Sequence, residues 1–413
     1  MDRSELCFLN ILRCSLKGIP LDCEPGLTEA EWEQVFRMAG MHHVLPLVFE
    51  TVYSLPELRG SPLLSSLKRT IFQQVMVQTQ KTADFLSLMQ ALSAAGVRPL
   101  VVKGIICRNL YPRPDHRISS DEDVLIDPAQ FSLCHRILTE QDLHTSLQPS
   151  DMASAYEVPY RQTGGALYIE LHRHLFPPES ESYGDLNRFF RDVRKKAVCE
   201  TISGVNVYTL GHTDHLFYLI CHAFKHFLHS GFGIRQVCDI VMYAGAYGCH
   251  IDWKQLEKNC RSIRALLFAA AVFRIGKNYL GFDPRQARMP DSWQQLSVDE
   301  LPMLEDLLQS GIYGYSSRSR QHSSSITLDA VAAQKQGRTA RNSVLLSLFP
   351  SADKLQSRYP YLKERPWLLP AAWASRMGSY CKESFGDKNN KASQSLEIGK
   401  QRLELLKKYG ILK

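Results

Sequence analysis

The first 96 residues carry apolar side chains at helical spacing. Three stretches repeat apolar positions every three or four residues: 4–17, 28–52 and 63–95. This spacing predicts amphipathic helices. Thr28 followed by Glu31 is a capping-box pattern for the start of the second helix, and Gly96 is a typical residue to end the third. The pattern therefore predicts an N-terminal helical region over residues 1–96.

Short strands replace helices after residue 96. Alternating or wholly apolar runs predict strands. They cover residues 99–102, 121–126, 166–174 and, as a hairpin, 197–208. Ser203-Gly204 is a typical hairpin turn, and we expect this hairpin to close the sheet. Residues 97–210 are therefore predicted to form one core unit.

From residue 212 the helical pattern returns, which predicts a helical domain over residues 211–315. Residues 316–325 are polar and weakly patterned, so we expect a loop or linker there. Residues 393–409 combine regularly spaced Leu and Ile with many charges, which predicts a terminal helix. Residues 316–413 are thus predicted to be a loop-rich and helical C-terminal extension.

Two carboxylates open the strand predicted at residues 121–126. Alternate side chains of a strand share a face, so Asp121 and Asp123 point the same way and Glu122 points away. Glu170 lies on the polar face of a later strand with His172. If these strands are neighbours, Asp121, Asp123 and Glu170 form a cluster for one or two divalent cations, Mg²⁺ or Mn²⁺. The alternatives are solvated acids at a strand entrance and, for His172, a strand-edge histidine that only hydrogen-bonds.

Positive charges and a helix start accompany these acids. Gly104 stands where a helix begins, so free backbone N–H groups and the helix dipole are expected to meet a phosphate. Lys103 and Arg117 supply cations in the same unit, and Arg117 is expected to steady the charge of a leaving pyrophosphate. The predicted nucleotide-binding residues are Lys103, Gly104, Arg117 and Ser120.

Three motifs resemble those of a known family. They are Lys103-Gly104, the strand Arg-x-x-x-Asp-x-Asp-Val-Leu-Ile from Arg117 and the strand Ile-Glu-Leu-His-Arg from Ile169. They are similar to the uncharacterised nucleotidyltransferase family, a bacterial branch of the polymerase-beta-type nucleotidyltransferases. The resemblance implies an α+β fold, with a small mixed β-sheet nucleotidyltransferase core flanked by N-terminal and C-terminal helical regions.

The same resemblance implies roles for individual residues. Lys103-Gly104 replaces the Gly-Ser signature of the wider superfamily. Asp121 and Asp123 would bind metal, with Glu170 as the third acid in a place where Asp is more usual. A histidine-containing helix near residue 222 also fits the family.

That helix carries His215, His222, His226 and His229 on one face. His222 and His226 have the i, i+4 spacing that zinc sites use. Three interpretations stay open: a polar seam between helices, a histidine-based metallohydrolase centre, and a face of the active cleft on which His222, Lys225 and His226 contact acceptor or phosphate. One turn apart on the next helix, Arg235 and Asp239 are predicted to form a supporting ion pair. His172 joins these as a possible acceptor or phosphate contact.

Composition and charge narrow the class of protein. The net charge of +7 over 413 residues suits anionic substrates but does not favour nucleic acid as a partner. One basic run stands out: Arg188, Arg191, Arg194, Lys195 and Lys196. It is read as a solvated helix end, with contact to a polyanion as the alternative. Charged residues near the N-terminus, short apolar runs and eleven cysteines without a Cys-x-x-Cys pair predict a cytoplasmic protein with no membrane partner.

These observations predict a Mg²⁺-dependent nucleotidyltransferase. It would move a nucleoside monophosphate from a nucleoside triphosphate, ATP among the candidates, to an unidentified small molecule, peptide or protein, and release pyrophosphate. The alternative is a catalytically degenerate nucleotidyltransferase fold that senses nucleotides or binds other proteins.

Overall fold

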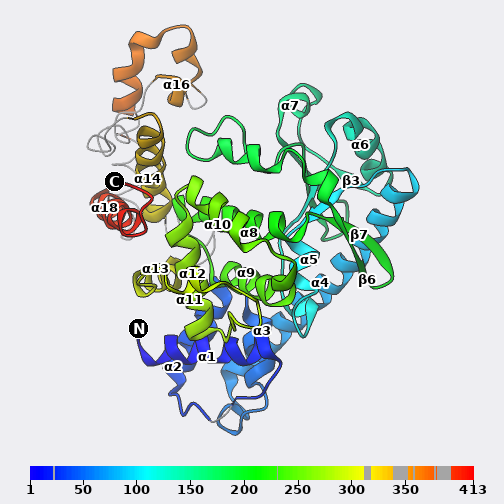
Figure 1. Ribbon diagram of the computed structural model, residues 1–413, viewed down its shortest axis with the longest axis vertical. Helices are drawn as coiled ribbons and strands as arrows, with labels where there is room; N and C mark the ends of the chain where they lie inside the picture. The colour runs from blue at the N-terminus through cyan, green and yellow to red at the C-terminus, as the bar shows by residue number, and fades with distance from the viewer. Residues whose placement is uncertain are drawn as a thin grey trace.

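A small β-sheet lies beside a larger set of helices in the computed structural model (Figure 1). The N-terminal helices, blue in Figure 1, occupy the bottom of the view, and α8 (His212–Leu228) and α9 (Ile234–Tyr247) lie near its centre. The structure describes residues 1–21, 24–229, 231–310, 318–337, 352–356, 359–375, 378 and 392–413. The predicted α+β class is confirmed.

The N-terminal region consists of α1 (Arg3–Lys17), α2 (Glu29–Met41), α3 (Leu45–Val52) and α4 (Pro62–Ala94). The predicted capping box is present, since Thr28 and Glu31 bond to each other's backbone N–H groups. The prediction of a single helix over residues 28–52 is wrong, because the helix is interrupted between α2 and α3. His43 there has a left-handed φ of 55°, and Pro46 in the first turn of α3 favours a new helix start.

The main sheet has five strands: β1 (Leu100–Val102), β2 (Glu122–Leu125), β3 (Leu143–His144), β4 (Glu157–Gln162) and β5 (Tyr168–His172). Their order is β1-β2-β5-β4-β3. β2 and β5 run parallel, and the other pairs are antiparallel. The register of the parallel pair sets Asp123 beside Glu170. This pairing brings together acids that are far apart in the chain.

The predicted hairpin forms β6 (Val198–Ile202) and β7 (Val205–Thr209), with a turn in which Ser203 and Gly204 both have positive φ. The expectation that it closes the main sheet is wrong, because β6 and β7 form a separate two-stranded sheet. A side chain makes the link to the main sheet instead. The Thr209 hydroxyl donates to the Val101 carbonyl over 2.6 Å.

The other helices surround the sheets. Within the core unit they are α5 (Gly104–Arg108), α6 (Phe131–Glu140) and α7 (Pro149–Ser154). Those that follow are α8 (His212–Leu228), α9 (Ile234–Tyr247), α10 (Trp253–Ser262), α11 (Leu266–Tyr279), α12 (Asp291–Gln294), α13 (Leu301–Ser310), α14 (Arg318–Lys335), α16 (Ala352–Leu355) and α18 (Ala392–Lys408). The basic run spans the short 3₁₀ turns η4 (Gly184–Phe190) and η5 (Val193–Lys196), with Arg191 between them. No helix within the described ranges is long and apolar enough to cross a membrane.

The loop predicted at residues 316–325 is wrong for residues 318–325, which belong to α14, while 316 and 317 lie outside the described residues. Tertiary contacts replace the weak local pattern. Arg320 of α14 and Arg402 of α18 both pair with Asp306, at 2.6 and 2.9 Å. Thr327 donates to the carbonyl of Leu228, and Arg402 to that of Phe227, so α14 and α18 hold the end of α8.

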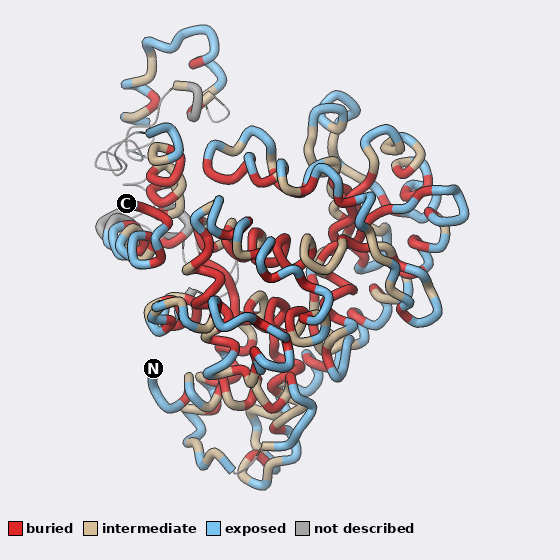
Figure 2. The backbone as a smooth tube through the Cα atoms, in the orientation of Figure 1, coloured by how far each residue is buried: buried red, intermediate tan, exposed pale blue. Residues whose placement is uncertain are grey.

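One hydrophobic core runs from Phe8 to Leu412 and includes side chains from all four predicted regions (Figure 2). A smaller cluster joins Leu355, Leu362 and Ala372 in the segment at the top of the view. The division into 1–96, 97–210, 211–315 and 316–413 stays a prediction about organisation along the chain.

The buried His42 is expected to make the fold sensitive to acid. Its side chain is fully buried, and its Nδ1 accepts the N–H of Ile234 at 3.3 Å. Burial lowers the pKa of His42 to about 4. In the unfolded chain the ring takes up its proton near pH 6.5, so stability falls as the pH drops from about 6.5 to about 4, by at most about 3 kcal/mol for this residue.

Urea denaturation across this pH window checks the expectation. His42→Gln keeps an acceptor for Ile234 but cannot take up a proton, so its stability should fall less with acid than that of the parent protein. Identical pH dependence of the two proteins would contradict the assignment.

Candidate active site

Three carboxylates converge where β2 and β5 lie side by side. Asp123 and Glu170 are neighbours in the parallel register, and Asp121 comes just before β2. Asp123 is buried at 2% exposure, whereas Asp121 and Glu170 are partly accessible. Glu122 points away from them into the core, as the alternation predicts. The sheet therefore gathers Asp121, Asp123 and Glu170 at one place.

Lys103 supplies the positive charge for these acids. Its Nζ lies 2.9 Å from Asp123 Oδ2 and 3.3 Å from Asp121 Oδ2. Burial alone would raise the pKa of Asp121, but the Lys103 ammonium holds it below its usual range. Burial opposes the charge on Lys103 as well, and the two carboxylates raise its pKa nonetheless. Lys103 and Asp121 are therefore both charged at neutral pH.

The backbone of Lys103 is strained. Its φ of 47° and ψ of −119° lie outside the regions that residues with a Cβ readily adopt. The adjacent His215 holds this conformation, because its Nε2 accepts the Lys103 N–H at 3.1 Å. Its Nδ1 is then the protonated nitrogen and donates to Thr209, 3.0 Å away. Burial lowers the pKa of His215 to about 3, so this neutral form is the stable one. The helical spacing predicts His215 on the histidine face of α8, but it does not indicate this contact with Lys103.

Gly104 has a different role from the one predicted. A Cβ at this position would lie 1.9 Å from Glu122 Oε2, and the φ of 33° also favours glycine. The Ile105 N–H at the start of α5 donates to that same carboxylate at 2.8 Å. The helix start thus binds a carboxylate of the protein itself, and this N–H group is not open to a phosphate.

Glu122 is held by a buried ion pair. Arg108 lies 2.9 Å from Glu122 Oε1, and both side chains are 1% exposed. Ser119 bonds to both members of the pair. On the other side of the same loop, Lys81 of α4 donates to the carbonyls of Ser119 and Ser120 at 2.7 and 3.0 Å. The N-terminal helical region therefore helps to position the residues that precede Asp121.

His172 lies among the acids. Its Nε2 is 3.1 Å from Asp123 Oδ1 and 3.6 Å from Glu170 Oε2, and Glu157 lies on its other side at 3.5 Å. Burial alone would lower the pKa of His172, but hydrogen bonds to Asp123 and Glu170 raise it to about 10. Burial, together with the neighbouring acids, raises the pKa of Glu170. His172 is therefore a buried cation in this structure and more than a strand-edge residue.

Arg117 is engaged elsewhere. Its Nε donates to Asp239 Oδ1 at 2.9 Å, and a second nitrogen bonds to Oδ2 of the same carboxylate. Tyr111 donates to Asp239 as well, at 2.8 Å. The supporting ion pair predicted between Arg235 and Asp239 is therefore replaced by one between Arg117 and Asp239. The reason is that α9 packs against α5, so Asp239 faces Arg117 in the segment before β2.

Arg235 takes the position expected for Arg117. It donates to the Ile118 carbonyl and lines the main cleft, and its charge helps to lower the pKa of Asp121. Arg117 and Gly104 do not line the main cleft but border a small side cavity of about 40 Å³, which Arg235 also reaches. Nothing local in the sequence distinguishes the two arginines, because the choice depends on how α9 packs.

The histidine face of α8 completes the cleft. His222, Lys225 and His226 line the same cavity as the three carboxylates, which has a volume of about 260 Å³. His222 Nε2 is 3.2 Å from Lys103 Nζ and 3.4 Å from His226 Nε2, and Gln236 lies 3.2 Å from its Nδ1. Burial and the nearby Lys103 charge lower the pKa of both His222 and Lys225. The structure thus brings this face together with acids about a hundred residues earlier in the chain.

The acidic group suits a divalent cation. One ligand atom each from Asp123, Glu170 and His172 lie within 4.8 Å of one another. The buried Asp123 Oδ2 makes no hydrogen bond, although the Lys103 ammonium is near. Carboxylate oxygens are preferred ligands of Mg²⁺ and Mn²⁺. Among the described residues, no third ligand joins His222 and His226, so the histidine-based metallohydrolase is not supported.

The fold and site together define a class of protein. A small mixed sheet that carries carboxylates on neighbouring parallel strands, beside a Lys-Gly turn, is the arrangement expected of a nucleotidyltransferase core. The family model described as uncharacterised nucleotidyltransferase matches residues 28–281, which is more than half of the chain. The chain belongs to this family, and the resemblance seen in its motifs is confirmed. No curated protein and no solved structure matches the chain.

The buried Arg108–Glu122 pair gives a prediction about the fold of the site. Arg108→Met leaves the Glu122 carboxylate buried without its cation, which is expected to destabilise the protein by about 3–5 kcal/mol. Adding Glu122→Gln removes the unpaired charge and keeps an acceptor for Ile105, so the double variant should regain part of that loss. Urea denaturation of the three proteins measures this. A double variant less stable than Arg108→Met alone would contradict it.

Proposed function

We propose that this protein transfers a nucleoside monophosphate from a nucleoside triphosphate to an acceptor hydroxyl, with Mg²⁺ or Mn²⁺ as cofactor. The acceptor oxygen would bond to the α-phosphorus while the bond to pyrophosphate breaks. The observation that carries the proposal is the parallel register of β2 and β5, which sets Asp123 beside Glu170 with Asp121 next to them. Membership of the nucleotidyltransferase family supports the class of reaction.

The metal would be held by Asp123 and Glu170, with Asp121 and His172 beside them. When bound, it supplies charge stabilisation for the phosphate oxygens and activates the acceptor oxygen. His172 would have to lose its proton to act as a ligand, whereas as a cation it contributes positive charge to the same place. Ser120 donates to Asp121 Oδ1 at 2.7 Å and holds that carboxylate in position.

The cations of the cleft would bind the triphosphate. Three cations line the cavity: Lys103 just before α5, Lys225 on α8 and Arg235 on α9. We assign to Arg235 the stabilisation of the leaving pyrophosphate that the sequence suggested for Arg117, since Arg117 is bound to Asp239. His222 is neutral because burial lowers its pKa, so it is expected to position the acceptor hydroxyl by a hydrogen bond, while the hydroxyl proton passes to solvent. The proposal includes an acceptor that carries a hydroxyl group, a nucleoside triphosphate as donor and a cytoplasmic location.

Removal of the carboxylates tests the metal site. Asp121→Asn combined with Asp123→Asn should abolish Mg²⁺-dependent release of pyrophosphate and weaken Mn²⁺ binding, because amides carry no charge. Asp151→Asn, at an exposed acid on α7, is the matched control and should change neither. Electron paramagnetic resonance of Mn²⁺ follows the metal directly. If the double variant turns over as fast as the control, the proposed mechanism is wrong.

Lys103 gives a prediction with two opposite signs. Its ammonium occupies the space between Asp121 and Asp123, so Lys103→Gln should tighten Mn²⁺ binding in the absence of nucleotide by removing a competing charge. The same change should weaken binding of the triphosphate, because a phosphate contact is lost. Titrations with Mn²⁺ alone and with Mn²⁺ plus nucleotide separate the two effects. Weaker metal binding in both titrations would contradict the assignment.

One observation favours a second function. Lys103 and His172 already neutralise the acids that would hold the metal. A chain in which they stay there would bind nucleotides without transferring them, as a nucleotide-sensing or protein-interaction module. Two measurements distinguish the two functions. Calorimetry measures triphosphate binding with and without Mg²⁺, and an assay with a cell lysate as the source of acceptors then measures pyrophosphate release. Metal-independent binding without release favours the module.

A further inference from the structure

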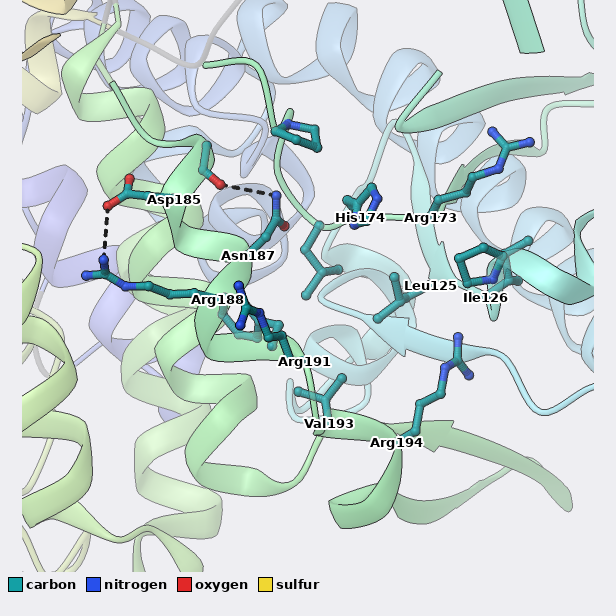
Figure 3. A pocket seen from close by; sticks show the side chains of 15 residues that line it. Leu125, Ile126, Arg173, His174, Asp185, Asn187, Arg188, Arg191, Val193 and Arg194 are labelled. Atoms are coloured by element: carbon teal, nitrogen blue, oxygen red, sulfur yellow. Dashed lines mark hydrogen bonds and ion pairs between the residues drawn. The ribbon is translucent and has the colours of Figure 1, made fainter. Parts of the chain in front are cut away.

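A second cavity lies beyond the far end of β2, next to the active cleft. Its volume is about 600 Å³. One side is formed by Leu125 and Ile126 at the end of β2, and the other by η4 and η5 (Figure 3). Leu175 borders both this cavity and the active cleft. Ile126 follows Asp123 by three residues, so the two sites are about 10 Å apart along the strand.

Arginines surround this apolar floor. Arg188, Arg191 and Arg194 come from the basic run, and Arg173 comes from the chain after β5 (Figure 3). The one carboxylate among the lining residues is Asp185. It is already shared by Arg188 and by Lys335 of α14, at 3.7 and 2.5 Å. The lining therefore carries an excess of positive charge.

Few protein groups balance these charges, since Asp127 acts on Arg194 from a distance and Arg188, Arg191 and Arg194 are exposed. Within the described part of the chain, Arg191 makes no hydrogen bond or ion pair. Arg194 has only a long bond of 3.4 Å to the Arg98 carbonyl. Arg173 donates to the carbonyls of Met152 and Ala155 and lies 3.7 Å above the Phe131 ring, so a neutral framework fixes its charge. Partial burial lowers the pKa of both Arg173 and Arg194, and the Asp127 carboxylate opposes this effect at Arg194.

We propose that this cavity binds a small organic anion, with an apolar body on Leu125, Ile126 and Phe190 and a phosphate group on the arginines. Guanidinium groups match phosphate oxygens with paired hydrogen bonds. The cavity is open to solvent, but its volume of about 600 Å³ lies in the range of small-molecule sites, which favours such a ligand over nucleic acid, which needs an extended basic groove. The position beside the cleft makes this a subsite for an acceptor that carries a phosphate. That last assignment rests on the proposed function, whereas anion binding does not.

Phenyl phosphate is the probe, because it combines an apolar ring with one phosphate. Calorimetry with the full chain should show binding at one site. Arg191→Gln and Arg194→Gln should each weaken it about ten-fold or more, since each removes a charged hydrogen bond. Lys195→Gln is the matched control. Lys195 lies in the same basic run, and its replacement by Gln removes the same charge. Its side chain is 81% exposed and pairs with Asp192. It should alter affinity by about two-fold or less.

Lys225→Gln, in the active cleft, should also leave the affinity for phenyl phosphate unchanged. Melting temperatures of all variants verify that they are folded. The proposal is overturned if the parent protein does not bind the probe, if Lys195→Gln weakens binding as much as Arg191→Gln, or if Lys225→Gln alone weakens it. A single-stranded oligonucleotide that displaces the probe and loses affinity in both Arg191→Gln and Lys195→Gln would assign the surface to nucleic acid instead.

The test of the anion site and the test of the proposed function have independent outcomes. Calorimetry measures binding alone, so the anion site stands even if the protein transfers no nucleotide. Conversely, pyrophosphate release by a protein that does not bind phenyl phosphate would remove this subsite and leave the proposed reaction intact.

Discussion

The parallel pairing of β2 with β5 is the constraint on which the site depends. Parallel strands cannot be joined by a tight turn, so a long connection must separate Asp123 from Glu170 in sequence. Once paired, the strands hold like charges close together in a buried place. Such a cluster is stable only with compensating cations, and Lys103 and His172 supply them. A divalent cation would do the same with more charge.

Other buried charges keep this cluster in place. Arg108 binds Glu122 on the opposite face of β2, and Arg117 binds Asp239 of α9, so the segment before Asp121 is fixed at both ends. His215 fixes the strained turn at Lys103. These groups do not face the cleft carboxylates directly. Their effect is to restrict where Asp121, Asp123 and Lys103 lie, which favours a site prepared before any ligand binds.

The region after the family match is part of the same structure. The match ends at residue 281, yet Thr327 of α14 and Arg402 of α18 bond to the last carbonyls of α8, the helix that carries His222, Lys225 and His226. Lys335 of α14 also contacts Asp185 at the arginine-lined cavity. The C-terminal helices thus stabilise the ends of elements that border both cavities.

The sequence by itself determined the elements whose signals are local. Helical spacing and capping residues predicted α1, α2 and α4, and strand alternation put Asp121 and Asp123 on one face with Glu122 on the other. It also identified the nucleotidyltransferase family. Only the tertiary structure decided which strands pair, that Arg117 rather than Arg235 binds Asp239, and that Gly104 accommodates Glu122. The physical reason is range: a capping box or an alternating strand is decided within a few residues, whereas Arg117 and Asp239 meet only because separate helices and strands pack together.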